Sequence, residues 1–404
     1  MIIGVVGIGY VGYPLACEFA KRYPVIAFDI DKNKIKNYKT KNIEFTTNES
    51  QLKLCDIIIV SVPTPIYSNK KPNLSFLKNA SKTIGENLKK GSIIVYESSV
   101  FPGCTEDICI PILEANSKLK YNEDFFVGYS PERVNIGDNL HQLLNIKKIV
   151  ASNNLKVLNI ITKLYSEIIE AGVYPVDNIK VAEAAKLIEN AQRDINIAFI
   201  NEMSLLLNKM NIDTRSVLDA AKTKWNFVDV KPGLVGGHCI GVDTYYLIDK
   251  SNSLNINLPL TKQARVINED MVNIVVNNIL NIIKTYNIKE SDANICFLGV
   301  TFKENVDDIR NSKTIEIINK LRKRHIHIMV NDPNVKLKNY DNKTVEEIKD
   351  MDLVVITVAH NEYKHLSIDT LKSMLKDDRN LIYDINGILD KKELEKNNLY
   401  TITL

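Results

Sequence analysis

One short stretch, residues 236–243, holds the side chains best suited to covalent catalysis. It reads Gly-Gly-His-Cys-Ile-Gly-Val-Asp, so the thiol of Cys239 follows a glycine pair and the carboxylate of Asp243 comes four positions later. If a helix begins near the cysteine, the two side chains share one face. The helix N-terminus then favours the thiolate, the nucleophilic form. We therefore predict a thiol nucleophile here, with a buried structural cysteine as the alternative.

A long amphipathic pattern over residues 180–212 carries a second set of polar groups. Lys186, Asn190 and Arg193 recur at i, i+4 and i+7, which places them on one stripe of a helix. An amine and an amide on its apolar side are suited to stabilise an oxyanion, and a solvated polar stripe is the alternative. A helix of this length suits a spacer and dimerisation element between two α/β lobes.

Three more residues of the central region have open roles. His238 is adjacent to the thiol, but adjacent side chains point apart, so we expect a structural role rather than a base. Trp225, the only tryptophan, is assigned to the core. Arg265 lies near the start of a helix predicted over 263–286, where a cation is unfavourable. That indicates an external partner, such as a phosphate or another subunit, or else a plain exposed arginine.

The N-terminal residues form a dinucleotide fingerprint in its expected context. An apolar strand at 2–6 leads into a glycine-rich turn, a helical pattern and a second strand that ends in Asp29. The glycines allow a tight turn, close approach of a pyrophosphate and close packing of helix on strand. Asp29 can accept from a ribose 2′-hydroxyl, which favours NAD over NADP. The fingerprint residues are Gly7, Gly9, Tyr10, Val11 and Gly12.

Polar residues cluster after the strands that follow, where ligands bind in open α/β sheets. Thr64 and Ser99 follow two such strands and are candidates for a cofactor loop. Turn and capping chemistry explains them equally well. Glu132 follows another strand, and a solvated loop carboxylate is its alternative. Strands are predicted at 56–62, 92–96, 125–129, 149–152 and 173–176, with a helix at 73–88.

The first pattern returns from residue 292. Residues 351–358, Met-Asp-Leu-Val-Val-Ile-Thr-Val, repeat the pattern of 55–62, Cys-Asp-Ile-Ile-Ile-Val-Ser-Val. The glycine fingerprint is replaced by Thr-Phe-Lys-Glu-Asn at 301–305 and then Arg310, so side-chain cations would meet phosphates. We predict an α/β protein with two Rossmann-like doubly wound domains joined by a long central helix. Its regions are 1–178 for NAD, 179–290 for dimerisation and catalysis, and 291–404 for a nucleotide co-substrate.

The composition is that of an ordinary globular protein. The 404 residues include 52 basic and 49 acidic ones, which argues against nucleic-acid and membrane partners. Six cysteines without a Cys-x-x-Cys pair argue against a metal site and favour a reducing cytoplasm. No apolar run reaches the length of a bilayer span, and no signal peptide is expected.

Taken together, the motifs resemble the UDP-glucose/GDP-mannose dehydrogenase family over nearly the whole length, especially its UDP-N-acetylglucosamine 6-dehydrogenase branch of the Vi-antigen type. The matching motifs are Gly-Ile-Gly-Tyr-Val-Gly, Val-Pro-Thr-Pro, Glu-Ser-Ser-Val-Phe-Pro-Gly, Ser-Pro-Glu-Arg, Ala-Ala-Lys-Leu-Ile-Glu-Asn, Gly-Gly-His-Cys-Ile-Gly-Val-Asp and Phe-Lys-Glu-Asn.

The resemblance implies a four-electron oxidation of the sugar 6-hydroxyl with two NAD⁺, through a thiohemiacetal and a thioester on Cys239, for surface polysaccharide biosynthesis. Lys186 and Asn190 match an oxyanion pair, Asp243 and Ser99 match residues that handle water, and Glu132 matches a carboxylate that assists hydrolysis. Arg265 resembles a residue that reaches a partner subunit's site, which implies a homodimer. Further implied substrate contacts are Arg133, Arg193, Gly236, Phe302 and Lys303, and Arg310 is an implied cofactor contact.

Some positions depart from the family pattern. Ser99 replaces a usual threonine, Ile136 and Thr244 replace usual prolines, and the segment after Tyr38 is short. None of these changes removes a catalytic group. The sugar epimer stays open among UDP-GlcNAc, UDP-GalNAc and UDP-ManNAc, as does UDP-glucose. The motifs also leave open a two-electron β-hydroxyacid dehydrogenase and a non-catalytic sugar-nucleotide-binding protein.

Overall fold

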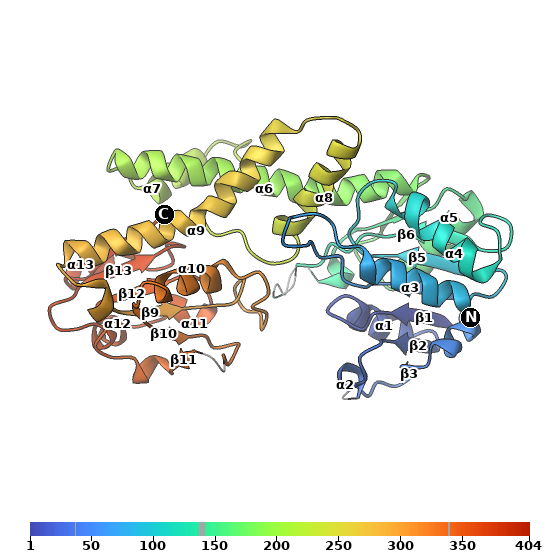
Figure 1. Ribbon diagram of the computed structural model, residues 1–404, viewed down its shortest axis with the longest axis horizontal. Helices are drawn as coiled ribbons and strands as arrows, with labels where there is room; N and C mark the ends of the chain where they lie inside the picture. Colours follow the sequence, from blue (N-terminus) through green and yellow to red (C-terminus); the bar gives the residue numbers. More distant parts are fainter. Residues whose placement is uncertain (37, 136, 138–141, 338–339) are drawn as a thin grey trace. The chain divides into compact units, whose positions relative to one another are not determined.

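The computed structural model of this chain describes residues 1–36, 38–135, 137, 142–337 and 340–404, so Ile136 lies outside the described residues. The chain divides into two compact units, and Figure 1 labels many of their elements. The central region expected at 179–290 contributes to both of them. The first unit comprises Met1–Asn190 and Val242–Asn257, and the second comprises Ala191–Gly241 and Leu258–Leu404.

The first unit contains an eight-stranded sheet in the order β3-β2-β1-β4-β5-β6-β7-β8. Its neighbouring strands run parallel, except that β6 and β7 pair antiparallel through Tyr129 and Ala151. The central strands are short runs of Ile and Val buried on both faces, as parallel sheets require. The strands are β1 (Ile3–Val6), β2 (Val25–Phe28), β3 (Ile43–Thr46), β4 (Ile57–Val60), β5 (Ile93–Tyr96), β6 (Phe126–Tyr129), β7 (Lys148–Ala151) and β8 (Val173–Val176).

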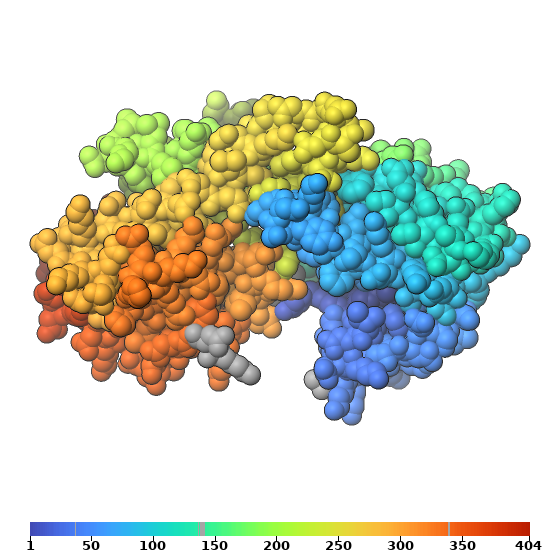
Figure 2. Space-filling model, viewed as in Figure 1, coloured from blue at the N-terminus to red at the C-terminus, as the bar shows by residue number. Residues whose placement is uncertain are grey.

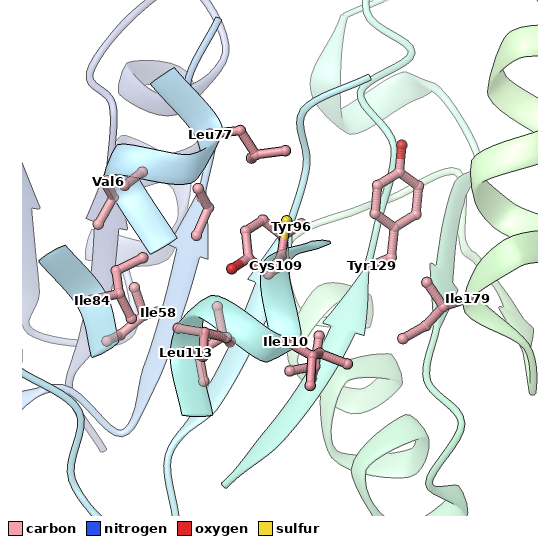
Figure 3. Packing of buried hydrophobic residues seen from close by; sticks show 14 of the residues in the cluster. Val6, Ile58, Leu77, Ile84, Tyr96, Cys109, Ile110, Leu113, Tyr129 and Ile179 are labelled. Atoms are coloured by element: carbon pink, nitrogen blue, oxygen red, sulfur yellow. The ribbon is translucent and has the colours of Figure 1, made fainter. Parts of the chain in front are cut away.

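Helices cover both faces of this sheet, because alternate residues of each strand point to opposite sides. Ile58 and Val60 of β4 share a buried cluster with α3 and α4, and Ile57 and Ile59 share another with α1 and α5. Figure 3 shows Ile84 of α3 beside Ile58 in the first cluster. The helices are α1 (Gly12–Ala20), α2 (Lys32–Ile35), α3 (Ser75–Glu86), α4 (Ile110–Ser117) and α5 (Leu155–Ser166), followed by the long α6 (Ile179–Lys209) and by α8 (Ile240–Ser253).

The second unit contains a six-stranded, wholly parallel sheet in the order β11-β10-β9-β12-β13-β14. Helices α9 and α10 pack on one face, and their surfaces meet in Figure 2 (gold and orange). The other face carries α11, α12 and α13. The elements are α7 (Thr214–Ala221), α9 (Pro259–Thr285), β9 (Asn294–Leu298), α10 (Lys313–Arg322), β10 (His327–Asn331), β11 (Asp341–Asn342), β12 (Leu353–Ile356), α11 (Asn361–Lys364), α12 (Ile368–Met374), β13 (Leu381–Asp384), α13 (Lys391–Lys396) and β14 (Tyr400–Ile402).

The two sheets repeat one design, as the sequence predicted. Asp56 precedes β4, accepts a hydrogen bond of 2.8 Å from the backbone N–H just before β1, and pairs with Lys89. Asp352 precedes β12, accepts 2.9 Å from the N–H that begins β9, and pairs with Lys376. In each sheet, an aspartate at the equivalent position therefore links the strands that come first and fourth in the sequence.

Two expectations for the central region were wrong. Trp225 is 91% exposed rather than part of the core. Helix α9 begins at Pro259, because proline suits the first turn of a helix, so Arg265 lies well inside the helix. Among the described residues, no helix is both long enough and apolar enough to cross a membrane.

Candidate functional site

The glycine-rich turn after β1 has the geometry that a pyrophosphate requires. Gly7 has φ +92°, which glycine adopts readily. A Cβ at Gly12 would lie 2.0 Å from the carbonyl oxygen of Gly7, so the start of α1 can approach β1 only with glycine at this position. Above Gly9, the nearest atom to such a Cβ is Lys34 Nζ at 3.8 Å, so the backbone there is open to a ligand. These residues fit an NAD pyrophosphate at the N-terminus of α1.

Asp29 ends β2 beside this turn. Its carboxylate accepts 2.8 Å from the N–H of Ile8 and 2.9 Å from Lys34 Nζ. Burial raises the pKa of Asp29, but bonds from Asp31 N–H and from Lys34 outweigh it, and the net pKa is lowered. The ionised carboxylate is the acceptor that ribose hydroxyls need. Sequence reasoning missed Lys34, a cation that lies between Asp29 and the open face of Gly9.

A buried cluster of polar side chains in the first unit lies around Asp243 on α8. Asn190 of α6 donates 2.6 Å to the carboxylate of Asp243, and Ser99 also bonds it. Lys186, one turn before Asn190, acts on the same carboxylate through its charge. Lys186, Asn190 and Asp243 are 7%, 3% and 2% exposed, so the solvated-stripe alternative is wrong for the first two. The structure thus brings together an amine, an amide, a hydroxyl and a carboxylate.

Burial dominates the electrostatics of this cluster. It raises the pKa of Asp243 to about 6, against the opposing effects of Lys186, Asn190 and Ser99. A carboxyl with a pKa near neutrality can both take up and release a proton at physiological pH. The arrangement is therefore suited to general acid–base catalysis beside an oxyanion site.

Glu132 lies over a second buried network at the end of β6. It accepts a very short hydrogen bond from the N–H of Val134, and its other oxygen is 3.7 Å from Lys148 Nζ. Lys148 also pairs with Glu97 at 2.5 Å, and Tyr165 donates 2.5 Å to Glu97. Burial is the main reason why the pKa of Glu97 is raised. Sequence reasoning missed Glu97 and Lys148, which hold Glu132 in place.

Arg133 contacts groups of its own chain. Its guanidinium pairs with Glu189 of α6 at 2.8 Å and donates 2.7 Å to the carbonyl oxygen of Lys147. Glu189 directly precedes Asn190, so this pair links the loop after β6 to the helix that carries the polar cluster. The expected substrate contact of Arg133 stays a prediction.

Helix α8 also contacts the loop after β4. Tyr246 donates 3.1 Å to the carbonyl oxygen of Pro65 and bonds the hydroxyl of Thr64. Burial raises the pKa of Tyr246 well above its usual value. Thr64 therefore has a partner within the chain, and its expected cofactor contact stays a prediction.

In the second unit, Gly236–Gly237 form a tight turn just before Cys239. Gly237 has φ +77°, and a Cβ there would lie 2.5 Å from the ring of Phe302. The amide of Asn311 donates 3.3 Å to the carbonyl oxygen of Gly237. Cys239 is exposed, and α8 begins at the next residue, as the sequence predicted.

A pocket of about 220 Å³ lies beside this turn, within the second unit. Lys303 and Phe302 both line it, so the Phe-Lys-Glu-Asn segment borders a cavity. Their expected contact with a nucleotide co-substrate stays a prediction. The other residues that line the pocket include Leu234, Gly236, Thr357 and Asn386.

Arg310 and His238 lie beside the turn. Arg310 pairs with Asp308 at 2.6 Å through a side chain that is half exposed. Burial, followed by the charge of Arg310, lowers the pKa of His238. The structural role that we expected for His238 stays a prediction.

Arg265 and Arg193 do not lie as the sequence suggested. Arg265 is 2% exposed and pairs with Asp194 at 2.7 Å and with Glu269 at 2.5 Å. A plain exposed arginine is therefore excluded at this position, and contact with a partner subunit stays a prediction. Arg193 is exposed and diverges from the buried Lys186 and Asn190. Among the described residues, no three His, Cys, Asp or Glu side chains gather to hold a metal.

Comparisons with known proteins agree with this arrangement. Residues 36–169, 180–270 and 296–391 match the NAD-binding, central and UDP-binding domains of the UDP-glucose/GDP-mannose dehydrogenase family. The chain is 43% identical to protein CapL of Staphylococcus aureus and 41% identical to UDP-N-acetyl-D-glucosamine 6-dehydrogenase of Salmonella typhi, with 97% of each chain covered. A UDP-D-ManNAc dehydrogenase structure from Pyrococcus horikoshii aligns with a TM-score of 0.89 at 29% identity, covering 97% of this chain and 96% of the other.

Proposed function

Because this chain belongs to the UDP-glucose/GDP-mannose dehydrogenase family, we propose that it oxidises the 6-hydroxyl of UDP-N-acetylglucosamine to a carboxylate while the sugar is held on Cys239. The chain is an NAD-dependent UDP-sugar 6-dehydrogenase of the group that acts on UDP-N-acetylhexosamines. The choice of the gluco sugar is supported by the higher identity to the Salmonella enzyme, 41%, than to the Pyrococcus UDP-D-ManNAc dehydrogenase, 29%.

The buried cluster around Asp243 is the observation that carries this proposal. Lys186 and Asn190 supply a positive charge and an N–H donor, which stabilise the oxyanion that forms at C6. Asp243, with a pKa of about 6, accepts the hydroxyl proton through an ordered water that Ser99 orients. Two NAD⁺, bound one after the other, would supply the hydride acceptors for the two oxidations.

Cys239 carries the second half of the reaction. Its thiolate adds to the C6 aldehyde, a C–S bond forms, and the carbonyl electron pair moves to the oxygen held by Lys186 and Asn190. Loss of the C6 hydride then gives the thioester. Water attacks the thioester, Cys239 leaves as thiolate, and Glu132 takes the proton of the water. Chain connectivity supports this assignment, since Cys239 directly precedes α8 and Asp243 lies four positions later, in the first turn of that helix.

The remaining assignments are proposals of the same kind. Lys303 and Phe302 contact the UDP moiety from the pocket that they line. Arg310 would exchange Asp308 for a cofactor phosphate. We further propose a cytoplasmic homodimer that serves surface polysaccharide synthesis. We also propose that Arg265, which pairs with Asp194 in its own chain, contributes to the partner subunit's site.

The test is an NADH assay across UDP-GlcNAc, UDP-GalNAc, UDP-ManNAc and UDP-glucose. We expect UDP-GlcNAc to give the highest kcat/KM and two NADH per sugar. Cys239→Ser should fail to complete the second oxidation, while Cys17→Ser on α1 serves as the matched control. One NADH per sugar with an unaffected Cys239→Ser variant would refute the thioester route and support a two-electron dehydrogenase. Absence of NAD⁺ reduction with every sugar would favour a non-catalytic protein.

A further inference from the structure

We propose that His360 positions the loop formed by residues 301–305 for UDP-sugar binding. The position of His360 in the second unit is equivalent to that of Thr64, a proposed cofactor-loop residue, in the first unit. This inference rests on the proposed function, because it assigns a role in binding the same substrate. His360 is 0% exposed, so it acts through the loop and not by touching the substrate.

The two sheets define the equivalence. In the first sheet, β4 lies beside β1, and Thr64 is the fourth residue after β4 ends at Val60. In the second sheet, β12 lies beside β9, and His360 is the fourth residue after β12 ends at Ile356. An imidazole therefore replaces a small hydroxyl at the crevice where Rossmann-type sheets bind nucleotides.

The hydrogen bonds fix the orientation of the ring. The backbone N–H of Asn305 donates 2.9 Å to His360 Nδ1, and the amide of Asn334 lies 3.0 Å from the same atom. Since Nδ1 accepts, Nε2 carries the hydrogen and faces Asp332 Oδ2 at 3.2 Å and Thr301 Oγ1 at 3.1 Å. The imidazole thus links both ends of the 301–305 loop to the carboxylate that follows β10.

The acidic residues that follow the equivalent strands β2 and β10 differ in their side-chain partners. Asp29, after β2, accepts from the turn after β1, and its other interactions include the half-exposed Lys34. Asp332, after β10, accepts 2.7 Å from Val300 N–H in the turn after β9, and His360 Nε2 lies 3.2 Å from that same oxygen, Oδ2. At both carboxylates the oxygen that accepts from the turn has a second partner, which is the half-exposed Lys34 at Asp29 and the fully buried His360 at Asp332. The carboxylate of Asp332 therefore serves the loop.

The loop needs this support because of its backbone. Asn305 has φ +57°, a left-handed conformation that an L-residue adopts at some cost. The same loop presents Phe302 to Gly237 in the turn before the thiol, and Lys303 to the pocket. Loss of the bond to Nδ1 would release Asn305 and displace both side chains.

Two substitutions separate the two ring nitrogens. In His360→Asn the amide oxygen takes the place of Nδ1 and can still accept from Asn305 N–H. In His360→Gln the amide reaches the place of Nε2 and leaves the Asn305 N–H without its acceptor. We expect UDP binding, measured by calorimetry, to weaken about tenfold or more in the Gln variant and about threefold or less in the Asn variant.

The controls make failure of the inference visible. NADH binding should stay unchanged in both variants, and His365→Gln, an exposed histidine nearby, should leave UDP binding unchanged. Equal UDP affinities for the Gln and Asn variants would overturn the inference. Failure of the wild-type protein to bind UDP would instead overturn the proposed function.

A measurement on the wild-type protein covers the case in which a variant does not fold. The amide hydrogen of Asn305 should exchange slowly with solvent, because its acceptor is a fully buried ring. Exchange as fast as that of an exposed loop amide would overturn the role of His360 without any substitution.

Discussion

Asp243→Asn should stabilise the folded protein at alkaline pH while it lowers turnover. The pKa of Asp243 is about 6 in the fold, against a usual 3.8. When a carboxyl has a higher pKa in the folded protein than in the unfolded chain, the fold loses stability as the pH rises between these two values. The difference of 2.2 units corresponds to about 3 kcal/mol of unfolding free energy above pH 7. Asparagine imitates the protonated acid, so it avoids this cost.

The pH dependence is the sharper part of this prediction. At pH 5 the carboxyl of Asp243 is largely protonated in the folded protein. Binding that proton costs less free energy at pH 5 than at pH 8. The amount by which Asp243 destabilises the fold therefore falls to about 1.5 kcal/mol at pH 5. Urea unfolding of the wild-type and Asp243→Asn proteins at pH 5 and pH 8 measures the change. Glu183, whose pKa is raised to about 7 by burial, titrates in both proteins, so it cancels in the difference.

Two results would refute this reasoning. A stability difference that is the same at both pH values would mean that Asp243 does not change its charge in this range. An Asn variant that is less stable at pH 8 would mean that the attraction of Lys186 outweighs burial. The kcat of the wild-type enzyme should fall on the acid side near pH 6, and this limb should be absent from the residual activity of the Asn variant.

Three other substitutions test separate parts of the chain. Lys148→Met leaves the Glu97 charge buried without its ammonium, so urea unfolding should show a loss of about 3–5 kcal/mol in the free energy of unfolding. The double variant that also carries Glu97→Gln should recover most of this loss. Gly237→Ala forces a side chain against Phe302 at positive φ, and calorimetry should show weaker UDP binding, by about 1–3 kcal/mol, with NADH binding unchanged. Asp29→Asn removes the charge that repels a 2′-phosphate, so the NAD over NADP ratio of kcat/KM should fall about tenfold or more, and an unchanged ratio would contradict this role.

Much of the fold was predictable because its signals are local. The strand after Asp56 and its counterpart after Asp352 could be matched by pattern alone, and both sheets have the expected place for them. The edge strands β3, β11 and β14 were missed, because they are short and carry polar residues. Trp225 was misplaced because hydrophobicity favours burial on average but does not fix the position of a single side chain.

The polar cluster was only partly predictable. Helical spacing correctly joined Lys186 to Asn190, since both lie on one buried face. The same spacing failed for Arg193, because burial depends on what packs against a helix, and the part of α6 that belongs to the first unit ends at Asn190. The burial of Arg265 was not foreseen because its counter-charges, Asp194 and Glu269, come from another helix and from a later turn. The pairing with Asp194, 71 positions earlier in the chain, leaves no local signal.

The discontinuous make-up of the first unit has a consequence for how the chain folds during synthesis. This unit lacks its last segment, Val242–Asn257, until the ribosome has passed residue 257 of 404. Until then Asn190 has no Asp243 to bond, and Leu187 lacks its contacts with Val242 and Tyr246. A nascent chain that ends before α8 should therefore bind chaperones through this open face. Maturation of the cofactor-binding half must wait for a segment encoded more than halfway along the gene.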